Sequence, residues 1–72
     1  MKRPSKTLEM MMYDLVESGH RPSLYLRGDV FRAHVDAAEN FWAEDESPTY
    51  AMQEAIENFV TVNGPLKVPI PS

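Results

Sequence analysis

The sequence has no cysteine, and no hydrophobic run approaches the ~20 residues of a membrane span. Without cysteine there is no disulfide bond and no thiolate metal site, which fits a reducing cytoplasm and makes the cytoplasm the expected location. The basic start of the chain is followed by an amphipathic segment that contains Glu9 and Asp14. We therefore expect neither a secretory signal peptide nor a membrane partner.

Recognisable catalytic motifs are also missing. The chain has no G-x-S-x-G nucleophile motif and no glycine-rich phosphate loop. A 72-residue chain buries only about 60% of its unfolded surface, so it can hardly spare core for a deep active-site cavity. We expect a protein that is not an enzyme, with no cofactor and no metal site.

The charge is unevenly distributed. Eleven acidic and seven basic residues give a net charge of −4, and Lys2, Arg3 and Lys6 lie in the first six residues. We interpret residues 1–6 as a flexible basic arm. The remaining body is strongly acidic, so it attracts basic proteins and is repelled by phosphate backbones. The expected partner is a basic protein, and nucleic acid is disfavoured.

The segment 7–18 has the apolar spacing of a helix with one buried stripe. The stripe consists of Leu8, Met11, Met12, Leu15 and Val16. Ser5 or Thr7 could cap its start, and Gly19 is suited to its end. We expect Met11 and Met12 in the core and Met10 partly exposed; the alternative is an adaptable methionine surface for binding.

From Leu24 the apolar period changes to two, which predicts a β-hairpin. Gly28-Asp29 provides a two-residue turn, with glycine supplying the positive φ. Such a turn pairs Leu26 with Phe31 and Leu24 with Ala33, so apolar residues share one face. A third strand is predicted at 41–44. An odd-length turn before it would bury Phe41 and Ala43 and expose Trp42, which we favour, whereas an even-length turn would bury Trp42.

The segment 47–60 is the helix around which the rest of the chain is organised. Ser47 is a good N-cap and Pro48 suits the first turn. The helix is expected to stop in the stretch Thr61-Val62-Asn63-Gly64 that follows Val60. Its apolar stripe is Met52, Ala55, Ile56, Phe59 and Val60, and Gln53, Glu54, Glu57 and Asn58 lie opposite. We interpret Asp45 and Glu46 as carboxylates that suit the positive end of the helix dipole, in preference to a metal or catalytic role.

The predicted fold class is α+β, with the order α-β-β-β-α in a single domain over 1–72. A three-stranded antiparallel sheet carries both helices on one face, which makes two layers around one core. The tail 65–72 alternates Leu66, Val68 and Ile70 with other residues, but its prolines restrict it to an edge strand or an extended segment. An exposed sheet edge beside this tail could support a homodimer.

The sheet face away from the helices is the candidate partner-binding surface. Tyrosine, tryptophan and arginine concentrate binding energy in interfaces. With the neighbouring acidic residues, the candidates are Tyr25, Arg27, Arg32, His34, Trp42, Glu44, Asp45 and Glu46. Two alternatives stay open: a nucleic-acid platform that also uses the basic arm, and an ordinary solvated face.

The two histidines have less specific interpretations. His20 follows a helix end, where a cation near the dipole is stabilising. His34 and Asp36 lie two residues apart on one strand face, a pairing that could suggest acid–base catalysis. With no pocket expected, we do not favour that enzyme hypothesis, and metal binding would need a third ligand.

The segment 30–72 resembles HicB-type antitoxins. The matching residues are Ser47 as the helix cap, Glu54-Ala55-Ile56 in the helix and Val68-Pro69-Ile70-Pro71-Ser72 at the end. The resemblance implies a small acidic domain with a partial RNase H-like fold and no nuclease activity, which covers a basic toxin ribonuclease.

This chain departs from the antitoxin pattern in two ways. It begins with a helix where the family begins with a strand, and it stops where antitoxins continue into a DNA-binding segment, so operator binding is not expected. The order of elements also resembles small phage and prophage proteins, some of which inhibit host enzymes or defence complexes. Both resemblances imply an acidic, non-catalytic module that occludes a basic partner.

Overall fold

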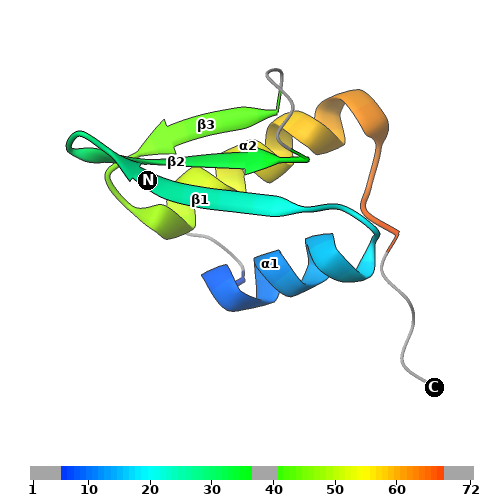
Figure 1. Ribbon diagram of the computed structural model, residues 1–72. Helices are drawn as coiled ribbons and strands as arrows, with labels where there is room; N and C mark the ends of the chain where they lie inside the picture. Colours follow the sequence, from blue (N-terminus) through cyan, green and yellow to red (C-terminus); the bar gives the residue numbers. More distant parts are fainter. Residues whose placement is uncertain (1–5, 37–40, 68–72) are drawn as a thin grey trace.

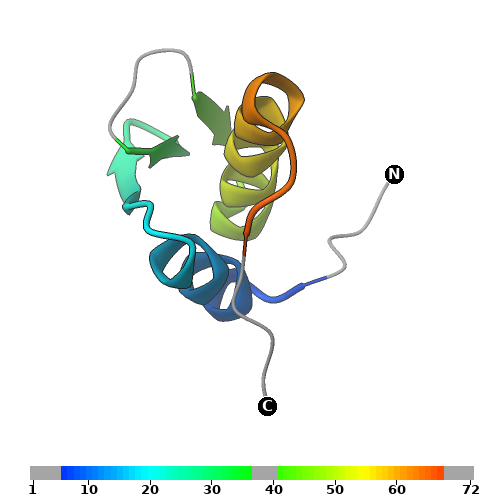
Figure 2. The same cartoon turned by 90° about the vertical axis from the view of Figure 1, so that its right-hand side faces the viewer.

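The computed structural model describes residues 6–36 and 41–67. The elements in chain order are α1 (Leu8–Glu17), β1 (Pro22–Arg27), β2 (Val30–Val35), β3 (Trp42–Asp45) and α2 (Pro48–Asn63). The strands form one antiparallel sheet in the order β1-β2-β3, and both helices lie on the same side of it (Figures 1 and 2). The predicted α+β class and the α-β-β-β-α order are confirmed.

Helix α1 begins at a threonine cap and presents a narrower buried face than predicted. The Thr7 hydroxyl accepts a hydrogen bond from the Met10 N–H at 3.2 Å. Met11 is buried, Met12 packs against the core and Met10 is exposed, as expected. Val16 was expected in the core but is exposed, because it faces a surface groove beside Pro22 and not α2 or the sheet.

The hairpin has the predicted register, with Leu24 opposite Ala33 and Leu26 opposite Phe31. Gly28 has φ +64°, which the tight turn requires. Ala33 is fully buried, but Leu26 is exposed although the alternation places it on the helix side. The reason is its position next to the turn, where the hairpin extends past both helices (Figure 1).

The third strand has the register that an odd-length turn gives. The Val35 N–H donates to the Phe41 carbonyl at 2.9 Å, which leaves residues 36–40, an odd number, between the paired ends. Ala43 is buried opposite Ala33, and Trp42 lies on the open side of the sheet. Phe41 is half-buried with its ring edge-on to Phe59 at 5.2 Å.

Helix α2 covers the sheet through small residues. Ser47 caps it, and it ends at Asn63, within the predicted stop at 61–64, because Gly64 at φ +85° is the first residue to leave the helical conformation. Alanines on both layers let helix and sheet approach closely, and Ala51 was not predicted in the core. The buried residues of the described chain are Met11, Leu15, Ala33, Val35, Ala43, Ala51, Met52, Ala55 and Phe59.

The segment after α2 is neither helix nor strand over residues 65–67. Leu66 packs against the core, as expected of a segment laid on the body. The predictions for Val68 and Ile70, and for most of the basic arm, lie outside the described residues. Lys6, at the end of that arm, forms an ion pair with Asp14 of α1.

Candidate functional site

The structure divides the predicted partner-binding residues between two surfaces. We call the first the open face: it is the side of the sheet away from the helices, and it carries Tyr25, Arg27, Arg32, His34, Trp42 and Glu44. We call the second the acidic cleft. It lies where β3 leads into α2, and it contains Asp45 and Glu46.

Arg32 is the central residue of the open face. Its guanidinium carbon lies 4.0 Å from the centre of the Trp42 ring, and its Nε lies 3.5 Å from a carboxylate oxygen of Glu44. Arg32 and Glu44 are direct cross-strand partners, so the register sets this pairing. At this distance the buried Nε forms no hydrogen bond, so the contact with Glu44 is an ion pair only. The Glu44 carboxylate would repel a phosphate group next to Arg32, which disfavours Arg32 as a phosphate ligand.

A second pair of rings lies beside Arg32. The rings of Tyr25 and His34 are stacked with 5.8 Å between centres, and the Tyr25 hydroxyl lies 3.4 Å from the His34 Nε2. The His34 Nδ1 atom is buried without a hydrogen-bond partner in the described part of the chain. Tyr25 and Trp42 are exposed, so the open face presents two aromatic side chains to solvent.

The structure does not bring His34 and Asp36 together; Asp36 pairs with His20 instead. The His20 Nδ1 and an Asp36 carboxylate oxygen are 2.7 Å apart, and the other oxygen accepts the Arg21 N–H at 2.7 Å. Asp36 has φ +60°, so it leaves the alternation of β2 and turns its carboxylate toward the segment before β1. His20 also packs edge-on against Phe59 at 4.5 Å between ring centres. The contacts of Asp36 tie two chain segments together, which the sequence pattern did not predict.

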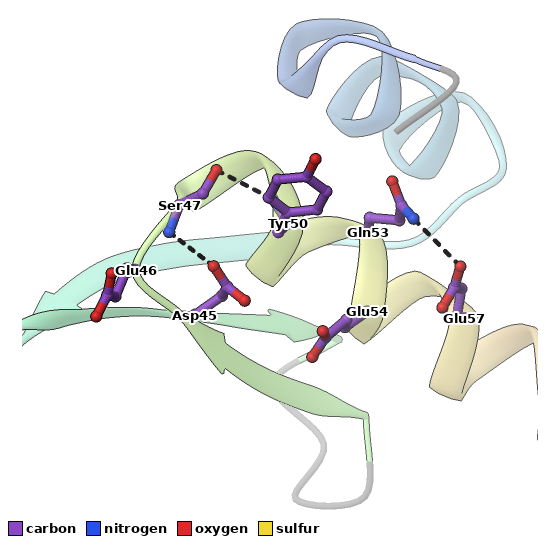
Figure 3. Close-up of a pocket in the computed structure, with 7 residues that line it drawn as sticks. All are labelled: Asp45, Glu46, Ser47, Tyr50, Gln53, Glu54 and Glu57. Atoms are coloured by element: carbon purple, nitrogen blue, oxygen red, sulfur yellow. Dashed lines mark hydrogen bonds between the residues drawn. The ribbon is translucent and has the colours of Figure 1, made fainter. Parts of the chain in front are cut away.

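The acidic cleft is a surface hollow of about 580 Å³ along one side of α2 (Figure 3). Its lining residues are Asp45, Glu46, Ser47, Tyr50, Gln53, Glu54 and Glu57. Hydrogen bonds hold part of this lining in place. The Ser47 N–H donates to Asp45 at 2.9 Å, and the Gln53 side chain donates to Glu57 at 3.4 Å.

Two carboxylates of the cleft are exposed and available to a ligand. Glu46 and Glu54 are exposed at the cleft. The Gln53 side-chain oxygen is buried and has no hydrogen-bond partner among the described residues. The cleft thus offers acceptors and negative charge, which is the complement of a lysine or arginine side chain.

The sequence prediction included Asp45 and Glu46 but missed the α2 residues of the cleft. Tyr50, Gln53, Glu54 and Glu57 are spaced at i, i+3, i+4 and i+7, the spacing that identified the buried stripe. The sequence pattern places Gln53, Glu54 and Glu57 opposite the apolar stripe and gives Tyr50 no role. The sequence did contain a signal for the cleft: Asp45 and Glu46 come just before the helix that carries this polar stripe.

Among residues 6–36 and 41–67, no group of three or more histidine, aspartate or glutamate side chains is arranged to hold a metal ion.

No helix in the described part of the chain has both the length and the apolar character needed to cross a bilayer.

The fold and these two surfaces define a small two-layer α+β protein with an open sheet face and an acidic cleft. Comparison of the chain with protein-family models, with curated proteins and with solved structures found no match. The resemblances to HicB-type antitoxins and to small phage proteins therefore stay predictions.

Proposed function

We propose that this protein is a small acidic protein-binding module that acts without catalysis, by occluding a basic surface of another protein. The acidic cleft is the observation that carries the proposal, because it is a concave site whose exposed charges have one sign. Occlusion needs only a surface of complementary shape and charge, which a small core can support.

The chemistry of the cleft favours a cationic side chain from the partner. Glu46 and Glu54 would attract a guanidinium or ammonium group and accept its hydrogen bonds. The Tyr50 ring lines the same hollow and offers an apolar wall for the methylene stem of a lysine or arginine. The proposed contact is thus an inserted basic side chain surrounded by a wider acidic surface.

The biological setting is part of this proposal. A cytoplasmic antitoxin that covers a basic toxin, or a phage-encoded inhibitor of a host enzyme or defence complex, would need this combination of small size, acidity and absence of catalytic motifs. The net charge of −4 would also speed association with a basic partner at low salt.

A nucleic-acid-binding module is the alternative, and exposed Tyr25 and Trp42 on the open face support it. Base stacking on aromatic side chains is a general mode of single-strand binding. The engagement of Arg32 with Trp42 and Glu44 counts against it, because the best-placed cation already has an acidic partner.

The test is a titration of the full chain with an arginine-rich peptide and, separately, with single-stranded DNA. We expect the peptide to bind, with NMR shifts at the cleft and an affinity that falls as salt rises. Replacing Glu46 and Glu54 with glutamine should weaken binding about tenfold or more, as expected for two interface charges.

The matched control removes the same charge elsewhere. Glu17→Gln with Asp29→Asn changes two exposed acidic residues of α1 and the hairpin turn, away from the cleft. We expect this variant to bind the peptide nearly as well as the wild type. Equal weakening by both variants would show that the peptide recognises the overall negative charge of the protein and not the acidic cleft. Binding of DNA in preference to the peptide would favour the nucleic-acid-binding alternative.

A further inference from the structure

The exposed carboxylates of the acidic cleft have no cationic partner in the described part of the chain. Neither Glu46 nor Glu54 lies within ion-pairing distance of a lysine or arginine among residues 6–36 and 41–67. Three of the seven basic residues of the sequence belong to the basic arm, residues 1–6, and two of these, Lys2 and Arg3, precede the described chain. The arm is therefore a source of positive charge that the described contacts do not account for.

The basic arm joins the body at the end of the molecule where the cleft lies. Helix α1 packs against α2, and both helices begin at the same end of the molecule (Figure 1). The cleft extends from the residues just before α2 along its first turns, from Asp45 to Glu57. Residues 1–5 are thus attached at the end of α1 nearest the start of the cleft.

The two flanks of α2 have different neighbours. On the β3 side, the Asn58 side chain donates to the Trp42 carbonyl at 3.0 Å, which ties this flank to the edge of the sheet. On the opposite flank, Tyr50 and Gln53 project from the side of the cleft where α1 lies (Figure 3). The cleft is therefore open to a segment that approaches from α1.

Lys6, the described residue of the arm, lies on the side of α1 that faces α2. Its side chain forms an ion pair with Asp14. The groove residues Met12 and Val16 mark the flank of α1 beside Pro22 of β1, and Asp14 lies on the other side of the buried stripe. Because α1 packs between β1 and α2, the Lys6 contact directs the arm toward α2.

Five residues are enough to cross from one helix to the other. An extended chain advances about 3.3–3.6 Å per residue, so residues 1–5 can reach at most about 17 Å. The axes of packed helices are about 8–10 Å apart. Lys2 and Arg3 can therefore reach α2 from the start of α1.

We propose that the basic arm occupies the acidic cleft through Lys2 and Arg3 when no partner is bound, and so competes with the basic partner from within the same chain. This regulation rests on the proposed function of the cleft. Charge selects the occupant, because the arm is the only part of the sequence in which three basic residues fall within six, and it has no acidic residue. Attachment to α1 also gives the arm a high effective concentration at the cleft.

NMR of the full chain without any peptide tests the contact directly. Lys2→Gln with Arg3→Gln should shift the amide signals of Glu46, Tyr50 and Glu54 at low salt, and the difference from the wild type should vanish at high salt. The matched control is Arg21→Gln with Lys67→Gln. It removes the same charge at two exposed residues that do not line the cleft, and it should leave those signals unchanged.

Titration with the arginine-rich peptide tests the competition. The arm variant should bind the peptide about threefold more tightly than the wild type, the gain expected if the arm fills the cleft about two thirds of the time. The control variant, whose net charge is the same, should gain less. Unchanged cleft signals in the arm variant, or an affinity gain no larger than that of the control, would each overturn the proposal.

These results separate the arm from the proposed function of the cleft. Peptide binding at the cleft with equal affinity in the wild type and both variants would overturn the arm contact and support the proposed function. A peptide that bound neither the wild type nor the arm variant would count against the proposed function, while the cleft signals without peptide would still decide whether the arm lies there.

Discussion

At the residue scale, Asp36 has the contacts with the largest structural consequence. Its carboxylate receives the Arg21 N–H and pairs with His20, while its own N–H donates to the Arg21 carbonyl at 2.7 Å. These contacts hold the end of β2 against the segment before β1, and His20 links the same point to Phe59 in the core. The backbone reaches this arrangement at φ +60°, which aspartate and asparagine tolerate better than most residues.

Asp36→Ala should lower the free energy of unfolding by about 2 kcal/mol, through lost hydrogen bonds to a charged group and a left-handed alanine. Asp36→Asn should lose less, because asparagine keeps an acceptor for the Arg21 N–H and tolerates the backbone conformation. Urea denaturation followed by circular dichroism measures both values. Stability equal to that of the wild type in Asp36→Ala would show that these contacts contribute nothing.

The residue scale also marks the limit of what the sequence pattern could predict. The neighbours of Arg32 follow from strand register alone, once the odd-length turn places Trp42 on the open face. The pairing of Asp36 with His20 does not follow, because it depends on one positive φ angle that breaks the alternation. Leu26 and Val16 have the correct periodicity, but periodicity says which side a residue faces and not whether anything covers it.

At the scale of the element, the caps explain where the helices start and stop. Thr7 and Ser47 accept hydrogen bonds from the N–H three residues ahead, and both caps were among the predicted candidates. The predicted stop of α2 at residues 61–64 is confirmed. The apolar stripe ends at Val60, but helical backbone continues to Asn63, and Gly64, whose φ is +85°, ends it.

Ser47→Ala should lower the free energy of unfolding by about 1 kcal/mol, the usual cost of losing an N-cap. The hydroxyl is 3.4 Å from the Tyr50 N–H, so its loss leaves that donor without a capping acceptor. Thr49→Ala in the first turn is the control and should change stability less. Thermal unfolding of both variants makes the comparison, and equal losses would show that the cap has no special role.

At the scale of the whole molecule, the structure separates an acidic region from an apolar one. The acidic cleft lies along α2 after β3, whereas most of the large exposed apolar residues of the described chain lie on α1 and β1. A chain of 72 residues whose core includes four alanines has little apolar area to bury within itself.

Asn58→Ala should expose the Trp42 carbonyl and so remove the protection of the β3 edge. We expect a larger average mass than that of the wild type at the same protein concentration, measured by light scattering. Asn63→Ala is the matched control, because the Asn63 amide bonds only to Phe59 within α2. An unchanged mass in Asn58→Ala would show that this side chain is not what protects the edge.

The hydrogen bond from Asn58 to β3 also has a consequence for the size of any assembly. The Trp42 carbonyl is one of the β3 backbone groups that point away from β2, and by the same alternation the backbone groups of Glu44 point outward too. A strand that added at this edge would find the Trp42 carbonyl already occupied by Asn58, so it would form one hydrogen bond fewer. Edge-to-edge growth through β3 would therefore begin with a weakened pair.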